Sequence, residues 1–219
     1  QFQHGWIDFE YRFQTATREH YPPGTLWRGE PIADKKLLVH FEQGLGDTIM
    51  FSRFLPQVRS LCGELVFECQ PALITLLRQS FPKIEIVAEG DSSGDFDIHL
   101  PLLSLGKRLG LDESNLLGDR PYLIANDHAT LPDSGRLRLG VAWAGNPHHK
   151  KDTSRSIAWE SFAALIGVDG VDYFSLQVGL RADDCRDSGV ISLDGQLSDC
   201  AATAATFAAA RPCGSPGCA

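Results

Sequence analysis

The sequence predicts an α/β fold with parallel sheets, divided into two domains. Short apolar runs alternate with segments of helical period, which is the pattern of consecutive βαβ units. This alternation stops at a polar stretch that contains Pro132, Asp133, Ser134 and Gly135, and then starts again. A chain of 219 residues suffices for two modest domains. We therefore place a domain boundary within residues 126–136.

The first domain is expected over residues 31–130. Its apolar runs predict strands at 37–41, 65–69, 84–87 and 96–100. Helical period predicts helices at 48–61, 71–80 and 102–109. Residues 1–30 are rich in aromatic side chains but have no clear period, so we expect an N-terminal arm that packs on the sheet.

The second domain is expected over residues 136–199 and is short. The predicted strands are 137–143, 173–177 and 190–193, and the predicted helix is 159–166. A doubly wound domain usually needs about 100–150 residues, so this one is expected to be incomplete. Residues 200–219 hold eight alanines, three cysteines and one charged residue. We interpret this tail as aberrant low-complexity sequence outside the fold.

The net charge, the length of the apolar runs and the cysteine spacing exclude several classes of function. The chain has 28 acidic and 20 basic residues, a formal net charge of -8, which argues against a general nucleic-acid binder. No apolar run approaches the roughly 20 residues of a membrane span, and Gln1 is not followed by a leader, so a cytoplasmic protein is expected. The cysteines lack metal-ligand spacing, so we expect no metal site, and we interpret Cys62 and Cys69 as buried thiols. No resident cofactor is expected.

The loop of residues 42–47, directly after the first strand, is the strongest candidate site. Gly44 and Gly46 would let the backbone turn tightly and approach a ligand without a Cβ in the way. The following helix offers unpaired N–H groups at its N-terminus. Asp47 either caps this helix or serves as a general base, while Glu42 and Gln43 support the loop.

A dinucleotide site is the alternative for this loop. Ile49 stands where a third glycine of the G-x-G-x-x-G fingerprint belongs, and Glu68 lies inside the second strand pattern rather than plainly at its end. No Gly-Lys-Ser/Thr follows, so the loop is not a P-loop. An NAD(P)-binding oxidoreductase therefore stays open as the weaker interpretation.

A second candidate loop, residues 143–156, lies between a strand and a helix and gathers lysines, an arginine and two adjacent histidines. Such a basic cluster in an acidic chain favours an anionic ligand. The planar fork of Arg155 suits a diphosphate, Asn146 could donate an amide N–H, and Ser156 could cap the next helix. We assign Ser156 and Gly145, with Arg155 and Asn146, to one donor-binding site. One such loop per domain predicts a ligand between the domains.

The 38–49 segment, continued by 51–54, resembles the glycosyltransferase domain found behind tetratricopeptide repeats in bacterial proteins. That domain is similar to glycosyltransferase family 9, the heptosyltransferase-like family. The resemblance covers nearly everything up to about residue 200. Further segments that fit the pattern are 9–12, 96–101, 121–123, 140–147 with 155–156, and 174–177.

The resemblance implies a GT-B fold of two facing Rossmann-like domains, and inverting, metal-independent transfer from a nucleotide-sugar donor to a protein or saccharide acceptor. It implies that Asp47 is the catalytic base and that Arg155 contacts the donor diphosphate. Residues 1–30 could then include a linker from upstream repeats. The family continues with a D-T-x-x-x-H-type segment, which the sequence after Leu197 approaches and then loses. A non-catalytic GT-B-like binding module is therefore the alternative to an active enzyme.

Overall fold

The computed structural model describes residues 2–15, 24–91, 95–116, 121–125 and 129–210. The chain forms two compact units, Gln1–Ile124 and Ala125–Ala219, and each is described by itself. This division falls immediately before the polar stretch at which the sequence predicts the boundary. Both units contain parallel sheets, so the α/β prediction is confirmed.

Unit 1 is built on a five-stranded parallel sheet with the order β1-β5-β2-β3-β4. Its strands are β1 (Thr25–Leu26), β2 (Ile32–His40), β3 (Cys62–Cys69), β4 (Glu85–Ala88) and β5 (Ile98–Pro101). The chain moves outward from β2 through β3 to β4 and then returns to the other side of β2 for β5. The winding therefore reverses between β2 and β5, and in open α/β sheets this reversal is where ligands bind, beyond the carboxyl ends of the strands.

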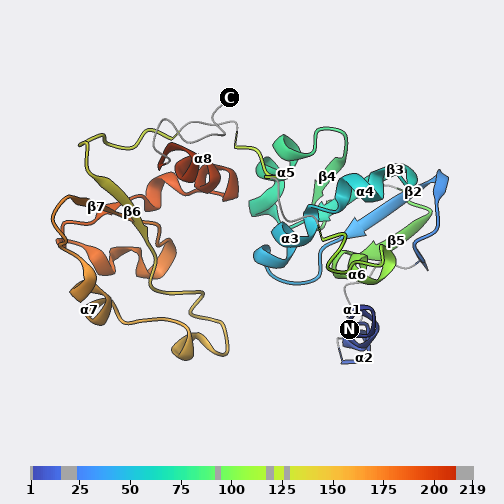
Figure 1. Cartoon of the computed structure of the whole chain (residues 1–219), viewed down its shortest axis with the longest axis horizontal. Helices are drawn as coiled ribbons and strands as arrows, with labels where there is room; N and C mark the ends of the chain where they lie inside the picture. The colour runs from blue at the N-terminus through green and yellow to red at the C-terminus, as the bar shows by residue number, and fades with distance from the viewer. Residues whose placement is uncertain (1, 16–23, 92–94, 117–120, 126–128, 211–219) are drawn as a thin grey trace. The chain divides into compact units, whose positions relative to one another are not determined.

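Helices surround this sheet (Figure 1). They are α1 (Phe2–Phe9), α2 (Arg12–Thr15), α3 (Leu45–Ser52), α4 (Leu55–Arg59), α5 (Ile74–Ser80) and α6 (Leu105–Arg108), with 3-10 turns η2 (Pro71–Leu73) and η3 (Leu102–Ser104). The single helix predicted at 48–61 is two helices, α3 and α4. Pro56 in the first turn of α4 explains the break, because proline has no N–H to continue the α3 ladder.

The core of unit 1 consists of buried apolar side chains from the central strands and from the segment before β2. Leu37 and Val39 of β2 and Phe67 of β3 are fully buried, as is Trp27. Cys62 and Cys69 are buried free thiols, as predicted, and burial raises the pKa of Cys69 to about 12. The predicted N-terminal arm exists, but its helix α1 packs against α6 rather than on the sheet.

Unit 2 contains a three-stranded parallel sheet with the order β6-β7-β8. Its elements are β6 (Leu137–Val141), η4 (Asp152–Ser154), α7 (Trp159–Phe162), η5 (Ala163–Leu165), β7 (Val171–Ser175), η6 (Gly179–Cys185), β8 (Ile191–Ser192), η7 (Asp194–Gln196) and α8 (Cys200–Ala210). Adjacent residues of β7 enter different clusters: Tyr173 packs with Trp143 and Trp159, and Phe174 packs with Leu193. Figure 1 accordingly shows α7 and α8 on opposite sides of the strands.

The expectation that the tail lies outside the fold is wrong for its first half. Residues 200–210 form α8, with Ala201 and Ala205 buried. The Asp199 carboxylate accepts a hydrogen bond from the Ala202 N–H and so caps the helix. Alanine has the highest helix propensity of the amino acids. Packing of the face that contains Ala201 and Ala205 stabilises this helix, although none of its residues is charged. Residues 211–219 lie outside the described residues. None of the described helices has the length and apolar character that a membrane crossing requires.

Candidate functional site

The 42–47 loop leaves the carboxyl end of β2 and enters α3, as the sequence predicts. Gly44 is the N-cap residue of α3, and Asp47, the third residue of the helix, is the carboxylate partner of a capping box, so the capping role expected for Asp47 is present. One carboxylate oxygen of Asp47, Oδ2, accepts a hydrogen bond from the Gly44 N–H at 3.1 Å. Within the described part of the chain, Oδ1 of Asp47 has no hydrogen-bond partner. The carboxylate is thus oriented through one oxygen and has acceptor capacity left on the other.

The two glycines of the loop have a different role from the one their sequence suggests. Gly44 has φ -72° and ψ 169°, and Gly46 lies within α3, so neither adopts a conformation that demands glycine. A Cβ at Gly46 would meet nothing within 4 Å, and one at Gly44 would touch only the Asp47 carboxylate. The glycines therefore leave open space beside the helix N-terminus instead of enabling a tight turn.

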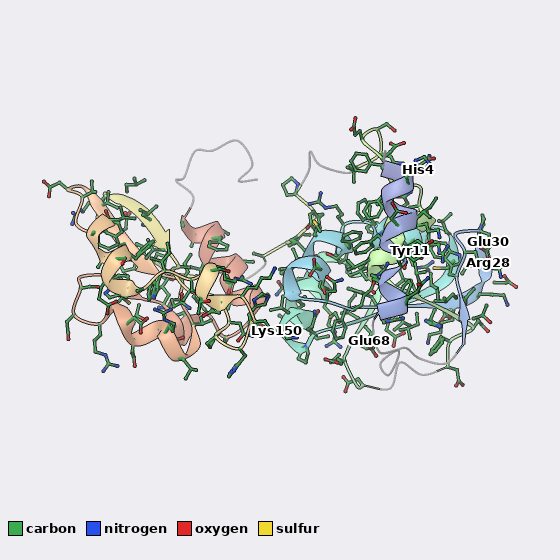
Figure 2. All side chains as sticks on the ribbon, turned by 90° about the horizontal axis from the view of Figure 1, so that it is seen from below. His4, Tyr11, Arg28, Glu30, Glu68 and Lys150 are labelled. Atoms are coloured by element: carbon green, nitrogen blue, oxygen red, sulfur yellow. The ribbon has the colours of Figure 1, made fainter. Side chains whose placement is uncertain are left out.

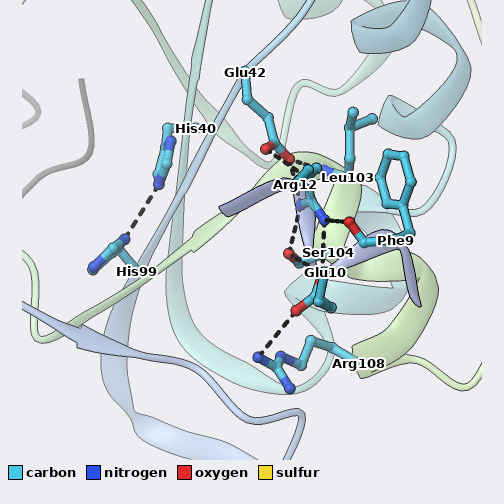
Figure 3. A network of polar contacts seen from close by, with 9 residues as sticks. All are labelled: Phe9, Glu10, Arg12, His40, Glu42, His99, Leu103, Ser104 and Arg108. Carbon is cyan, nitrogen blue, oxygen red and sulfur yellow. Dashed lines mark hydrogen bonds and ion pairs between the residues drawn. The ribbon is translucent and has the colours of Figure 1, made fainter. Parts of the chain in front are cut away.

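Glu42 is held at the point where the winding of the sheet reverses. Its side chain is 6% exposed, and its carboxylate accepts hydrogen bonds from Arg12 Nε at 3.0 Å and Arg12 Nη2 at 2.8 Å. The Leu103 N–H, which follows β5, donates to the same carboxylate at 3.0 Å. Figure 3 shows Glu42 drawn toward Arg12 and Leu103. Glu42 therefore joins the loop after β2 to the turn after β5. The supporting role in a site that the sequence predicts for Glu42 stays a prediction.

Arg12 lies at the centre of a wider polar network (Figure 3). Its Nη1 donates to Glu10 Oε1 at 2.9 Å and its Nη2 to Ser104 Oγ at 2.8 Å. Arg108 Nη2 is 3.6 Å from Glu10 Oε2. Burial opposes the charge of Arg12, but its hydrogen bonds to Glu42 and Glu10 outweigh burial and raise its pKa above the ordinary value. The sequence shows Glu10 and Arg12 only as part of a family-like segment and gives them no role.

A second contact holds the loop from the side of β3. Gln70, the residue after β3, donates from Nε2 to the Gln43 carbonyl oxygen at 2.8 Å. Its Oε1 accepts a hydrogen bond from the Thr48 hydroxyl at 2.9 Å. Gln43 therefore supports the loop through its backbone, not its side chain. Gln70 has no motif that sequence reasoning could have recognised.

Two buried histidines lie close to this loop in the sheet. His40 Nε2 and His99 Nδ1 are 3.2 Å apart, and the residues are 2% and 4% exposed. Burial and the neighbouring His99 lower the pKa of His40 to about 4, and burial lowers the pKa of His99 as well. Both rings are therefore neutral at pH 7. Glu68, labelled in Figure 2, lies within β3 opposite His40, and burial and Glu89 raise its pKa.

In unit 2 the 143–156 loop follows β6 and is tied together by Ser156. The Ser156 hydroxyl accepts a hydrogen bond from the Gly145 N–H at 2.9 Å and donates to Asp152 Oδ1 at 2.5 Å. The predicted helix cap is therefore wrong: Ala158 is the N-cap residue of α7, and Ser156 closes the loop instead. Gly145 lies under Arg155, because a Cβ placed on it would be 3.1 Å from Arg155 Nε.

Arg155 and Asn146 are both exposed on this loop. Asn146 uses its side-chain oxygen within the loop, where it accepts a hydrogen bond from the His148 N–H at 3.0 Å. This contact does not use its amide N–H groups, and the donor role expected for them stays a prediction. Lys150, labelled in Figure 2, is exposed on the same loop. The loop therefore presents cationic and amide donors to solvent.

The start of this loop is fixed by Gln177, which the sequence predicts as the last residue of a strand and which here follows β7. Its Oε1 accepts hydrogen bonds from the Trp143 N–H at 3.4 Å and the Ala144 N–H at 3.0 Å. Its side chain lies in the buried part of the unit, after β7. Gln70 and Gln177 thus act alike, each bridging from the end of a neighbouring strand to the candidate loop of its own unit.

The structure brings the predicted residues together within each unit. Glu42 to Asp47 form one site at the end of β2, and Gly145, Arg155 and Ser156 form another after β6. Among the described residues, no three His, Cys, Asp or Glu side chains gather as metal ligands would. A ligand shared by the two loops stays a prediction from the sequence.

No family model matches the chain. The chain is 34% identical over 90 residues to "Protein FlbA" of Caulobacter vibrioides (strain ATCC 19089 / CIP 103742 / CB 15), and the match covers 38% of this chain and 15% of FlbA. A crystal structure of the bacterial iron-containing dodecameric glycosyltransferase TibC from enterotoxigenic E. coli H10407 is similar with a TM-score of 0.47 and 16% identity, over 66% of this chain and 42% of TibC.

Proposed function

We propose that the chain is a sugar-transfer module of GT-B type, in which Asp47 is the general base and the 143–156 loop binds a nucleotide-sugar donor. The observation that carries this proposal is the Asp47 carboxylate, oriented by the Gly44 N–H through one oxygen at the opening of α3. This position, beyond the carboxyl end of β2, is where open α/β sheets hold their ligands. The acceptor is a hydroxyl of a protein or a saccharide.

The proposed reaction is a single displacement with inversion. The acceptor oxygen attacks the anomeric carbon and passes its proton to Asp47. The bond between the anomeric carbon and the phosphate oxygen breaks, and its electron pair leaves with the nucleoside diphosphate. The remaining acceptor capacity of Asp47 is what a base needs at this step. In this proposal, Arg155 neutralises the negative charge that builds up on the leaving nucleoside diphosphate. Neither a metal ion nor a resident cofactor is required.

The geometry of the unit 2 loop supports an anion site. Arg155 is exposed and lies over Gly145, where the small residue leaves the guanidinium accessible. A guanidinium can bind two phosphate oxygens with parallel hydrogen bonds. Ser156 already uses its hydroxyl between Gly145 and Asp152, so its proposed role changes from ligand contact to holding the loop. Asn146 supplies an additional amide donor.

Titration calorimetry with UDP and GDP tests the donor half of the proposal. Arg155→Ala should weaken binding roughly tenfold to hundredfold, since a hydrogen bond to a charged group contributes about 1.5–3 kcal/mol. Arg186→Ala is the matched control, because Arg186 is an exposed arginine of the same unit that pairs with Asp183. Equal affinity of the two variants would contradict the donor site.

The assignment of Asp47 as the general base can be tested with the same protein. A panel of nucleotide sugars with protein and saccharide acceptors, assayed for transfer and hydrolysis, should show turnover that Asp47→Asn lowers by about 10²–10⁴-fold. Asp34→Asn, a change at an exposed carboxylate of β2, should leave turnover intact. Turnover retained by Asp47→Asn would reject the base assignment. Diphosphate binding without any turnover in the unmodified chain would identify the non-catalytic module instead.

A further inference from the structure

We infer that Arg12 is a positioning residue of the candidate site: through Glu42, it sets the geometry of the loop that carries Asp47. The effect of Arg12 on catalysis rests on the proposed function. Its effect on the geometry of the loop does not. Arg12 begins α2, thirty residues before Glu42 in the chain. The N-terminal helical segment then takes part in the site and does more than pack against α6.

The contact between Arg12 and Glu42 is well suited to positioning. Two nitrogens of Arg12 bind the two oxygens of Glu42, at 3.0 and 2.8 Å, so the pair has a defined orientation as well as a short distance. The Leu103 N–H adds a third donor to the same carboxylate. A carboxylate so fully engaged is a poor general base, and its function is to fix the backbone at position 42.

The guanidinium of Arg12 is itself held tightly. It lies 4.5 Å from the ring centroid of Phe9 and 4.1 Å from that of Phe13. The side chains of Arg12 and Glu42 are 14% and 6% exposed, so water competes little for their hydrogen bonds. Lysine carries the same charge but has no planar fork and cannot bind both oxygens of Glu42 in this way.

The rest of the network balances charge around Arg12. Glu10 accepts hydrogen bonds from Arg12 and from the Ser104 hydroxyl, and Arg108 lies on its other side. The network therefore joins three chain segments: the N-terminal helices, the loop after β2, and the turn after β5. A buried polar network loses more when one member is removed than one pair would suggest, because the remaining charges keep their desolvation cost.

Loss of the two hydrogen bonds from Arg12 to Glu42 should disturb the 42–47 loop locally. Gln70 still holds the Gln43 carbonyl and Thr48 from the side of β3, so α3 keeps its place. Glu42, by contrast, loses both hydrogen bonds from the Arg12 guanidinium, and the Leu103 N–H contact stays in place. The expected result is a loosened turn between Glu42 and Gly44, next to an intact sheet.

Amide hydrogen exchange, followed residue by residue by NMR, tests this inference in Arg12→Lys. The Leu103 N–H reports on Glu42 and the Gly44 N–H reports on Asp47. Both amides should exchange about tenfold faster or more, while amides of β3 keep their rates. The matched control is Arg59→Lys, since Arg59 is a part-buried arginine of the same unit that donates to the Cys62 carbonyl, away from the loop.

Unchanged exchange at Gly44 in Arg12→Lys would overturn the positioning role. An equal acceleration throughout β3 would also overturn it, because Arg12 would then contribute only to global stability. If Arg12→Lys does not fold, Glu42→Gln gives the same test: it keeps the shape and the acceptor for Leu103 but removes the charge. Gly44 should again exchange faster, and an unchanged rate there would contradict the inference.

Transfer assays separate this inference from the proposed function. With turnover present, Arg12→Lys should lower kcat and leave the donor KM unchanged, because it displaces the base without touching the donor loop. A raised donor KM with unchanged kcat would contradict the inference. Absence of turnover in the unmodified chain would count against sugar transfer, and the exchange rates would still decide the role of Arg12.

Discussion

His40 and His99 illustrate how a buried residue couples the fold to pH. Each is an ordinary strand residue in the sequence, but β2 and β5 are neighbours in the sheet, and their imidazoles face each other at 3.2 Å. Because burial and His99 lower the pKa of His40 to about 4, the folded chain keeps this ring neutral well below the ordinary value of 6.5. The unfolded chain takes up the proton first.

The free energy of unfolding should therefore fall as the pH drops from 6.5 toward 4. The loss is at most about 1.4 kcal/mol per pH unit for His40, or about 3 kcal/mol over the whole range. Above pH 6.5 the contribution of His40 is constant. Urea unfolding between pH 8 and pH 4.5 measures this, and His40→Gln should have a shallower dependence on pH. An identical slope in the variant would contradict the lowered pKa.

At the scale of elements, the contact between α1 and α6 depends on one glycine. A Cβ at Gly106 would lie 2.5 Å from Cε3 of Trp6, well inside contact distance. The Trp6 indole N–H also donates to the Leu111 carbonyl at 2.7 Å, so the ring cannot move aside without losing this bond. Gly106 thus allows the close approach of the N-terminal segment that brings Arg12 to Glu42.

Gly106→Ala and Gly46→Ala form a matched pair. Both changes gain helix propensity, by up to about 1 kcal/mol. Only Gly106→Ala meets a neighbour, and overpacking costs typically about 1–3 kcal/mol. Gly106→Ala should therefore be the less stable variant, with a lower Tm and altered tryptophan fluorescence, while Gly46→Ala keeps or raises the Tm. Equal melting temperatures would show that α1 is not packed against Gly106.

Local sequence signals predicted some elements well and others poorly. Most strands lie on the apolar runs, but β1 was not predicted and β2 begins at Ile32, before its run at 37–41. The 42–47 loop lies between a strand and a helix as expected. The break between α3 and α4 was signalled by Pro56, but the helical period continued across it. The α8 helix was missed because its alanines give little amphipathic contrast, and only packing on Phe174 and its neighbours identifies it.

At the scale of the whole molecule, the sheet of unit 2 has an unusual edge. Its order places β6 at one side, next to β7 alone within the described residues. Leu137 and Leu139 of β6 are 65% and 43% exposed, although such apolar strands normally lie inside a parallel sheet. An exposed apolar edge strand is a template for pairing with another chain. This geometry agrees with the expectation of an incomplete second domain, which stays a prediction.

Leu139→Lys should therefore reduce self-association. The unmodified chain is expected to show concentration-dependent association in sedimentation velocity, because β6 offers both apolar side chains and unpaired backbone groups. Leu165→Lys is the control, since Leu165 is 66% exposed but lies in a 3-10 turn. A monomeric unmodified chain at high concentration, or equal effects of the two variants, would contradict the role of β6.

The sequence by itself determined the α/β class, most of the strands and the two loops that carry Asp47 and Arg155. These features are local: apolar period, glycine position and the order of elements are readable along the chain. Only the tertiary structure decided which residues support the loops. His40 meets His99 across 59 residues because β2 and β5 are neighbours in the sheet although they are far apart in the chain. Arg12 meets Glu42 across thirty residues because the N-terminal helical segment packs closely against α6.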